Sequence, residues 1–390
     1  MSAVKPAKLF HYFCPCPRGL EAVLARELTA LDGNDVQVSN GGVACRGPLS
    51  LGYRINLEAR IPSRVLLRLI DVPCTNERVL YQRCREVVWE DWFSARHTLR
   101  VDVVAIRSPL KSLNFATLRI KDAIVDRFRE RGGLRPSIDT RNPDVRISAF
   151  LTADRLQLYV DLSGEPLFKR GWRSGRDRRV FAPLKENLAA GLLALSGWQP
   201  GRPLGDMFCG SGTIIIEAAQ QLCGRAPGLN RKFGIERLSI HEPTLLHQLI
   251  ERLENRARDG MAEAPHNQLW ASDLDAHAIE LARTNLELAG LPADLVRFRQ
   301  ADAAEVRPPE GEAGITVSNP PYNERVGIPL EHWRDIGRNL REHFGGWHVF
   351  LLTSDRALPG QLGLREKHKT PLFNGALECR LFDFEMRKRG

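Results

Sequence analysis

A short apolar strand that leads through a glycine-rich turn into a helix constrains the fold of this chain more than any other segment. The strand is predicted to end at Asp206, and the helix to begin at Thr213. Between them lie Gly210 and Gly212, which have no Cβ and so let the backbone approach a ligand that side chains would exclude. Ile215 stands where the dinucleotide-binding fingerprint requires glycine, which argues against binding of a dinucleotide pyrophosphate at this turn.

Three later strands also end in polar residues. The segment Leu269–Asp273 ends in an acid placed to hold ribose hydroxyls, and the strand that begins at Val296 leads to Asp302, which can accept from an adenine amino group. The apolar run from Ile315 leads into an Asn-Pro-Pro-Tyr turn. Ligands in open α/β sheets bind at the carboxyl ends of the strands, so we expect these turns to form one site.

The Asn-Pro-Pro-Tyr turn suits recognition of a planar base. Pro320 and Pro321 fix φ and lack an N–H, which makes a stiff, extended loop. The loop can present the Asn319 side-chain oxygen and the Pro320 carbonyl as two acceptors, with Tyr322 as a ring for stacking. Two acceptors and a ring fit a base with an exocyclic amino group. An ordinary turn would use the same residues, so the motif gains its meaning from the other strand ends.

Together these motifs resemble the class I S-adenosylmethionine (SAM) methyltransferases that act on exocyclic amines. Residues 12–21, 161–173 and 182–190 are similar to signatures of the THUMP-domain methyltransferases, specifically the RlmL-type 23S rRNA guanine-N2 methyltransferases. The likeness runs nearly end to end. One departure is Asn323, where the family loop usually has glycine, and it leaves the shape of the target-base loop open.

The resemblance implies an α/β fold with several domains. We expect a C-terminal Rossmann-like class I methyltransferase domain, with a mostly parallel seven-stranded sheet and a terminal antiparallel hairpin, preceded by α+β ferredoxin-like and THUMP domains. The expected ranges are a ferredoxin-like lobe at 1–50, a THUMP RNA-binding domain at 51–163, a basic linker at 164–180 and the methyltransferase domain at 181–390. Some relatives carry a second, fused methyltransferase half, and we expect its activity to be absent.

Local patterns predict several individual elements. Alternating apolar residues and turn signals favour two hairpins in the first half of the chain and one at its end, and helical periodicity favours two long helices. The hairpins are expected around Asn40-Gly41, across 145–162 and around Phe373-Asn374-Gly375, and the helices across 115–131 and 242–258.

The resemblance also implies the roles of individual residues. Both hydrogens of a guanine N2 amine would bond to the Asn319 oxygen and the Pro320 carbonyl, which favours a pyramidal nitrogen whose lone pair points to the methyl group. Positioning then supplies most of the barrier reduction. The expected catalytic residues are Asn319, Pro320, Pro321 and Tyr322, and the expected SAM contacts are Asp206, Phe208, Gly210, Gly212, Thr213, Asp273, Asp302, Pro183 and Lys185.

The charge of the chain is compatible with the RNA partner that the resemblance implies. The net charge is +9, and basic residues gather around Trp172 in residues 169–179. Such a basic segment can bind phosphates with salt-sensitive affinity, although a solvated linker would have the same composition. The expected RNA-binding residues are Lys169, Arg170, Arg173, Arg176 and Lys121, and the resemblance implies 23S rRNA as the RNA.

Other classes of protein are disfavoured. The sequence has no run of eighteen apolar residues and no signal peptide, so we expect no membrane span. Its eight cysteines form no Cys/His quartet, which predicts reduced thiols in a cytoplasmic protein and no metal site.

Several functions remain open beside the favoured one. The same chemistry on a tRNA guanine is the nearest alternative, followed by methylation of adenine N6, which the Asn-Pro-Pro-Tyr turn also suits. A non-catalytic RNA-binding assembly factor would be expected to have lost part of the site, and a dehydrogenase conflicts with Ile215.

Overall fold

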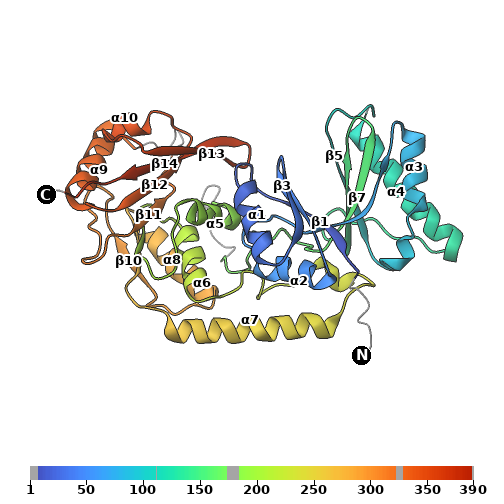
Figure 1. Cartoon of the computed structure of the whole chain (residues 1–390), viewed down its shortest axis with the longest axis horizontal. Coiled ribbons are helices and arrows are strands. Elements are labelled where there is room, and N and C mark those ends of the chain that lie inside the picture. Colours follow the sequence, from blue (N-terminus) through green and yellow to red (C-terminus); the bar gives the residue numbers. More distant parts are fainter. Residues whose placement is uncertain (1–7, 111, 174–183, 322–327, 389–390) are drawn as a thin grey trace.

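The computed structural model describes residues 8–110, 112–173, 184–321 and 328–388, and within them two seven-stranded sheets lie side by side (Figure 1). The N-terminal sheet has the strand order β2-β3-β1-β4-β7-β6-β5. All its pairs are antiparallel except β5 with β6. Its strands are β1 (Phe10–Pro15), β2 (Asn34–Ser39), β3 (Gly42–Gly47), β4 (Leu66–Pro73), β5 (Leu99–Ala105), β6 (Val145–Leu151) and β7 (Arg155–Asp161).

Strand β4 joins the two parts of this sheet, because it pairs with β1 on one side and with β7 on the other. The ferredoxin-like and THUMP segments therefore share one continuous sheet. The helices of this half are α1 (Glu21–Ala30), α2 (Leu49–Glu58), α3 (Glu77–Glu86) and α4 (Leu113–Gly132), with a 3-10 turn at Trp89–Asp91. Local signals bound α4, since the Ser112 side chain accepts from the Phe115 N–H and Gly133 ends the helix in the left-handed region.

The C-terminal sheet has the order β10-β9-β8-β11-β12-β14-β13. Its first five strands pair in parallel, and β14 pairs antiparallel with both β12 and β13. The expected parallel sheet with a terminal antiparallel hairpin is confirmed. The strands are β8 (Leu204–Asp206), β9 (Leu269–Asp273), β10 (Val296–Gln300), β11 (Ile315–Ser318), β12 (His348–Thr353), β13 (His368–Asn374) and β14 (Leu377–Glu385).

The strand order reverses at β8, with β9 on one side of it and β11 on the other. Such a switch point opens a crevice at the carboxyl ends of the two strands, where open α/β sheets bind ligands. The helices of this half are α5 (Glu186–Leu195), α6 (Thr213–Leu222), α7 (Pro243–Glu263), α8 (Ala276–Leu288), α9 (Leu330–His343) and α10 (Leu358–Leu362), with a 3-10 turn at Gly234–Arg237.

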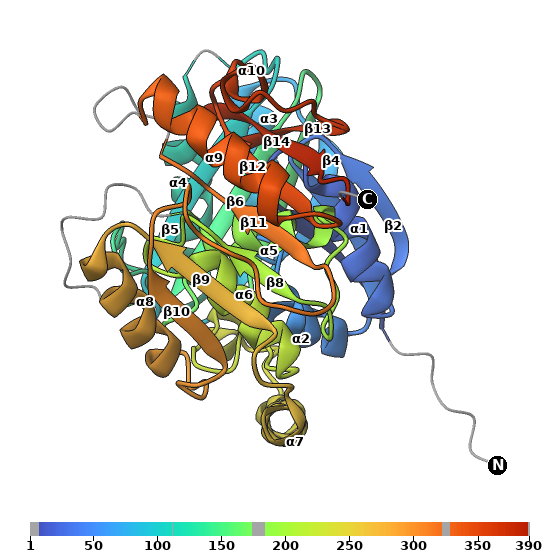
Figure 2. The same ribbon diagram turned by 90° about the vertical axis from the view of Figure 1, so that its left-hand side faces the viewer.

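A shared apolar core runs through both halves, because buried residues of both sheets belong to the same cluster, and a second cluster lies within the C-terminal half. Helices α1 and α5 touch closely: a Cβ built on Gly191 would lie 2.3 Å from Cδ1 of the buried Leu20. Helix α7 runs along the base of both halves in Figure 1 and is seen end-on in Figure 2, apart from the sheets. Among the described residues, no helix has the length and apolar character needed to cross a membrane.

Candidate active site

Asp206 ends β8 and is almost fully buried beneath the glycine-rich turn. Its Oδ1 accepts from the Phe208 N–H at 3.2 Å, and its carboxyl also bonds to the Ser318 hydroxyl. Ser318, the last residue of β11, accepts from the Met207 N–H at 2.9 Å. The pKa of Asp206 is raised to about 7, mainly by burial and to a smaller extent by the charge of Asp273, while the two hydrogen bonds oppose this shift.

The two glycines of the turn have different surroundings. Both adopt positive φ, +50° at Gly210 and +82° at Gly212. A Cβ on Gly210 would meet no described atom within 4 Å, so open space borders the turn there, whereas a Cβ on Gly212 would lie 3.0 Å from the Ala282 Cβ on α8. Gly210 therefore leaves room for a ligand, and Gly212 allows α6 to pack against α8.

Two further acids lie at the ends of neighbouring strands. Asp273 accepts from the Gly210 N–H at 2.9 Å and from the Asp275 N–H at 3.0 Å. Asp275 itself caps α8 by accepting from the His277 N–H, so it has a structural role. Asp302, after β10, is paired through Oδ1 with His332 Nε2 at 3.0 Å and keeps a quarter of its side chain exposed.

Asn319 directly follows β11, and its side-chain oxygen is the most informative atom of the site. Oδ1 is buried and has no hydrogen-bond partner among the described residues. A desolvated acceptor without a partner costs about 1–3 kcal/mol, and a bound donor would remove that cost. Pro320 is buried behind it and Pro321 is exposed, while Tyr322 lies outside the described residues.

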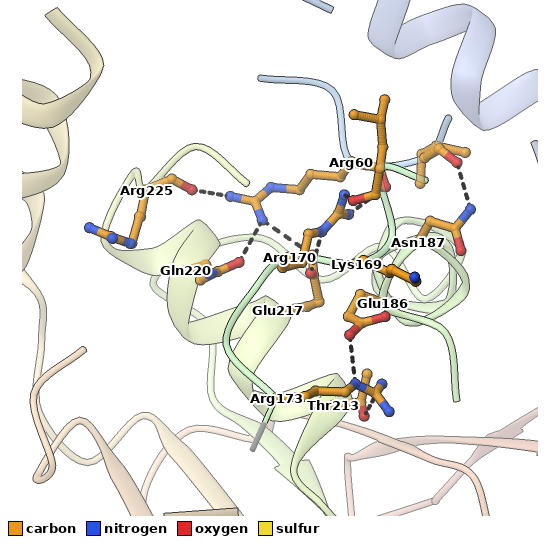
Figure 3. A network of polar contacts seen from close by, with 12 residues as sticks. Arg60, Lys169, Arg170, Arg173, Glu186, Asn187, Thr213, Glu217, Gln220 and Arg225 are labelled. Carbon is orange, nitrogen blue, oxygen red and sulfur yellow. Dashed lines mark hydrogen bonds and ion pairs between the residues drawn. The ribbon is translucent and has the colours of Figure 1, made fainter. Parts of the chain in front are cut away.

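The remaining predicted cofactor contacts lie around the start of α6 and α5. The Thr213 hydroxyl accepts from Arg173 at 3.2 Å (Figure 3), and the Lys185 ammonium lies 4.9 Å from the centre of the Phe168 ring. The Phe208 ring lies 6.1 Å from the ring of Trp333 on α9. Pro183 lies outside the described residues.

The prediction that Arg170 binds RNA is wrong for the folded chain. Its side chain is only 1% exposed, and its Nε lies 3.0 Å from the buried carboxylate of Glu217 on α6 (Figure 3). The other oxygen of Glu217 accepts from Arg60 at 3.2 Å. Arg60 follows α2, so this carboxylate holds the linker, α6 and the N-terminal half together. A run of basic residues in the sequence did not distinguish this internal pair from surface charges.

Arg173 is also bonded within the protein. Its Nε donates to Glu186 on α5 at 2.6 Å, and its Nη2 donates to the Leu184 carbonyl as well as to Thr213 (Figure 3). Lys169 is exposed and pairs with Glu165, and Lys121 lies 3.0 Å from Asp122. RNA contacts of these three residues stay predictions, and Arg176 lies outside the described residues.

Sequence reasoning missed several residues of the site. Glu217 stands in an otherwise apolar run, which could have signalled a buried charge, but nothing local identifies Arg60 as its partner. Ser318 and His332 carry no motif and are found only through their contacts with the turn and with Asp302. Among the described residues, no group of His, Cys, Asp or Glu could hold a metal ion.

Three family models match consecutive parts of the chain. They are the RlmL ferredoxin-like domain at residues 11–66, the THUMP domain at 74–161, and an RMKL-like methyltransferase domain at 173–383. A curated relative from Syntrophotalea carbinolica, named Ribosomal RNA large subunit methyltransferase K/L, is 40% identical over 96% of this chain and 53% of its own length. The protein of the same name from Aeromonas hydrophila is 39% identical over 96% of this chain and 54% of its own length. The chain thus spans about half the length of the curated relatives it matches.

Two solved structures are similar over nearly the whole chain. A protein of Listeria monocytogenes, described as a predicted N6-adenine-specific DNA methylase, is 30% identical with a TM-score of 0.86, covering 97% of both chains. SMU.472, described as a putative methyltransferase complexed with SAH, is 28% identical with a TM-score of 0.85, covering 98% of this chain and 100% of its own. These likenesses confirm the methyltransferase fold.

Proposed function

Because the chain belongs to the family of RMKL-like methyltransferase domains, we propose that it transfers a methyl group from SAM to the N2 amine of a guanine in 23S rRNA. The names of the curated relatives support ribosomal RNA as the substrate, and the matched THUMP domain supports an RNA partner. The SAH in a similar structure supports SAM, since SAH is what SAM becomes after it gives up its methyl group. The resemblance implies guanine 2445 as the target nucleotide, and we propose it on that ground alone, since the names of the relatives state the RNA and not the position.

The described residues fit SAM at the carboxyl ends of β8, β9 and β10. When bound, SAM supplies a methyl group on a positively charged sulfonium. Asp273 provides a carboxylate beside the turn, Asp206 adds a buried carboxyl that ionises above its raised pKa of about 7, and Gly210 leaves open space next to its backbone. Asp273 would hold the ribose and Asp302 the adenine. Each carboxylate oxygen of Asp273 already accepts one backbone N–H, which fixes its orientation and leaves further lone pairs for hydroxyl groups.

The buried, unpartnered Oδ1 of Asn319 is the observation that carries the proposal. A guanine amine is a poor nucleophile, because its lone pair is delocalised into the ring. Two hydrogen bonds, one to this oxygen and one to the Pro320 carbonyl, would hold the amine hydrogens and direct the lone pair toward the methyl group. The nitrogen becomes a strong acid once it is methylated, so its proton can leave to water without a strong base. To reach the pocket the base must leave its stack.

The test is a methylation assay with labelled SAM, with 23S rRNA and bulk tRNA as substrates and the products digested to nucleosides. We expect N2-methylguanosine in 23S rRNA from the wild type. Asn319→Ala should lower kcat by about 10²–10³-fold, as the loss of one positioned transition-state hydrogen bond does elsewhere, and should leave SAM affinity unchanged. The variant should keep or slightly gain stability, because it removes a desolvated, unpartnered oxygen.

Asn255→Ala is the matched control. Asn255 is exposed on α7, outside the THUMP segment and away from the glycine-rich turn, so the same chemical change should leave activity untouched. Equal rates for Asn319→Ala and wild type would refute the assigned role of Asn319. Label in tRNA alone would keep the chemistry and overturn the substrate, and absence of SAM binding would overturn the enzyme itself.

One observation favours a second candidate, methylation of adenine N6. The similar Listeria protein is described as a predicted N6-adenine-specific DNA methylase, and an adenine amine could offer its hydrogens to the same two acceptors. The nucleoside digest distinguishes the two, because N6-methyladenosine and N2-methylguanosine separate on chromatography. A duplex DNA substrate in the same assay checks the choice of nucleic acid.

A further inference from the structure

A second cavity lies in the N-terminal sheet, away from the glycine-rich turn. Its volume is about 310 Å³, at the small end of the range for ligand pockets, about 300–1,000 Å³. All the described residues that line it belong to strands β1, β2, β3, β4 and β7. The side chains that matter here are His11, Phe13, Arg46, Arg68 and Tyr159.

The strand register places these side chains on one face of the sheet. On β1, Tyr12 and Cys14 are buried in the core, so His11 and Phe13 between them point to the opposite face. His11 on β1 lies opposite Arg46 on β3, and Arg68 on β4 lies opposite Tyr159 on β7. Neighbouring strands thus bring aromatic rings and guanidinium groups together.

The chemistry of the cavity suits a nucleotide. The half-buried Phe13 ring offers apolar surface to a base, and the buried ring of Tyr159 packs 6.1 Å from it and supports it from the core side. Two arginines line the cavity, and each has an aspartate partner: Arg46 pairs with Asp35 at 3.0 Å, and Arg68 pairs with Asp71 at 3.2 Å. A guanidinium group has five N–H donors, so each arginine keeps donors for a phosphate. The buried Nε of Arg46 has no hydrogen-bond partner among the described residues, so one donor there is unused.

His11 adds a polar edge. Burial, and then the charges of Arg68 and Arg46, lower its pKa below the usual value, against smaller opposing effects of Asp35 and Asp71. The ring is therefore neutral at pH 7 and has one donor and one acceptor to present to a base.

We propose that this cavity binds an unpaired nucleotide of the RNA substrate, with the base against Phe13 and a phosphate near Arg46 and Arg68. The proposal rests on the proposed function, because it takes RNA as the partner. Unpaired bases, unlike paired ones, can stack on aromatic side chains of an open sheet, and arginines beside them bind the backbone. The site would fix the RNA at a point distant from the methylated base.

Asp71 provides a matched pair of variants for the test. It accepts from Arg68 at 3.2 Å and from Arg155 at 2.6 Å, but only Arg68 lines the cavity. Arg68→Gln and Arg155→Gln in the full chain each remove one positive charge and one partner of the same carboxylate. Affinity for a fluorescent single-stranded RNA and for its duplex is measured by anisotropy at several salt concentrations.

Arg68→Gln should weaken single-strand binding about fivefold and reduce the salt slope by about one, and Arg155→Gln should change neither. Phe13→Leu should weaken single-strand binding about tenfold without changing the salt slope, because it removes stacking and leaves the charge. Thermal unfolding of each variant confirms that it is folded.

Equal affinities of Arg68→Gln and Arg155→Gln would overturn the proposal, as would an equal loss on duplex and single strand. SAM binding and methyl transfer by the wild type separate this failure from failure of the proposed function. If the wild type binds SAM and methylates RNA while Arg68→Gln binds RNA normally, only the cavity assignment falls.

Discussion

At the scale of single residues, the candidate site combines an acceptor without a partner and an acid that is costly to ionise. Asn319 Oδ1 lacks a hydrogen-bond partner among the described residues, and burial holds the pKa of Asp206 at about 7. Both features are unfavourable in the free protein. Both would be relieved by ligands of the expected kind, since an amine donates hydrogen bonds and a sulfonium carries positive charge.

The raised pKa of Asp206 predicts that SAM affinity depends on pH. A cationic ligand favours the ionised carboxylate, so affinity should rise as the pH increases from 6 to 8, through the pKa of about 7. Calorimetric titration of SAM at several pH values measures this. Asp206→Asn should bind more weakly, with a smaller pH dependence, and an unchanged pH profile in that variant would contradict the assignment.

The raised pKa of the Asp206 carboxyl also predicts how the free energy of unfolding of the ligand-free protein depends on pH. Its folded pKa lies above the unfolded value of about 3.9, so the folded state binds the extra proton between these values. The stabilising contribution of Asp206 is therefore complete below pH 4 and is lost as the pH rises through about 7, at up to about 1.4 kcal/mol per pH unit. Comparing urea unfolding of wild type and Asp206→Asn isolates this contribution.

At the scale of elements, α6 connects the cofactor turn with the rest of the molecule. It begins at Thr213, directly after the turn, and one helical turn later carries Glu217, which is fully buried between Arg60 and Arg170. Arg173 reaches the Thr213 hydroxyl from the linker. The position of the turn therefore depends on ion pairs with segments that are remote in the sequence.

Glu217→Gln should lower the free energy of unfolding by about 3–5 kcal/mol, because it removes the buried carboxylate that pairs with both Arg60 and Arg170. Glu378→Gln is the control: Glu378 is also held by two arginines, Arg356 and Arg380, but half its side chain is exposed. That change should cost about 0–1 kcal/mol. Urea unfolding gives both values, and similar losses for the two variants would rule out a special contribution of the buried pair.

At the scale of the whole molecule, the continuous core predicts that both halves unfold together. Gly191 lies where α5 meets α1, and a Cβ there would overlap the buried Leu20. Gly191→Ala should therefore destabilise the protein by about 1–3 kcal/mol through overpacking. The exposed Gly360 on α10 has open space around it, so Gly360→Ala should stabilise by about 0.4–1 kcal/mol.

Urea unfolding of the wild type, Gly191→Ala and Gly360→Ala tests these predictions, with unfolding monitored by both circular dichroism and tryptophan fluorescence. In the wild type the two signals should change in one transition, since Trp89 and Trp270 lie in different halves of the protein. Separate transitions in the wild type, or stabilisation by Gly191→Ala, would mean that the contact between α1 and α5 is looser than the structure has it.

The sequence alone determined those features that depend on neighbouring residues. The glycine turn after β8, the acids that end β9 and follow β10, and the proline turn after β11 each follow from local backbone preferences, and so do the hairpins and the long helices α4 and α7. Because parallel strands bring their carboxyl ends to one edge, the order of these motifs was sufficient to predict the fold class and one common site.

Tertiary structure alone decided which charges are buried and which segments meet. Arg170 and Lys169 are adjacent in one basic run, yet the first is sealed against Glu217 and the second is exposed. Strand β4 joins two predicted domains in one sheet, and His332 reaches Asp302 from a distant helix. These contacts join residues far apart in the chain. The strength of these contacts depends on burial and on distance, and neither can be predicted from a local pattern of residues.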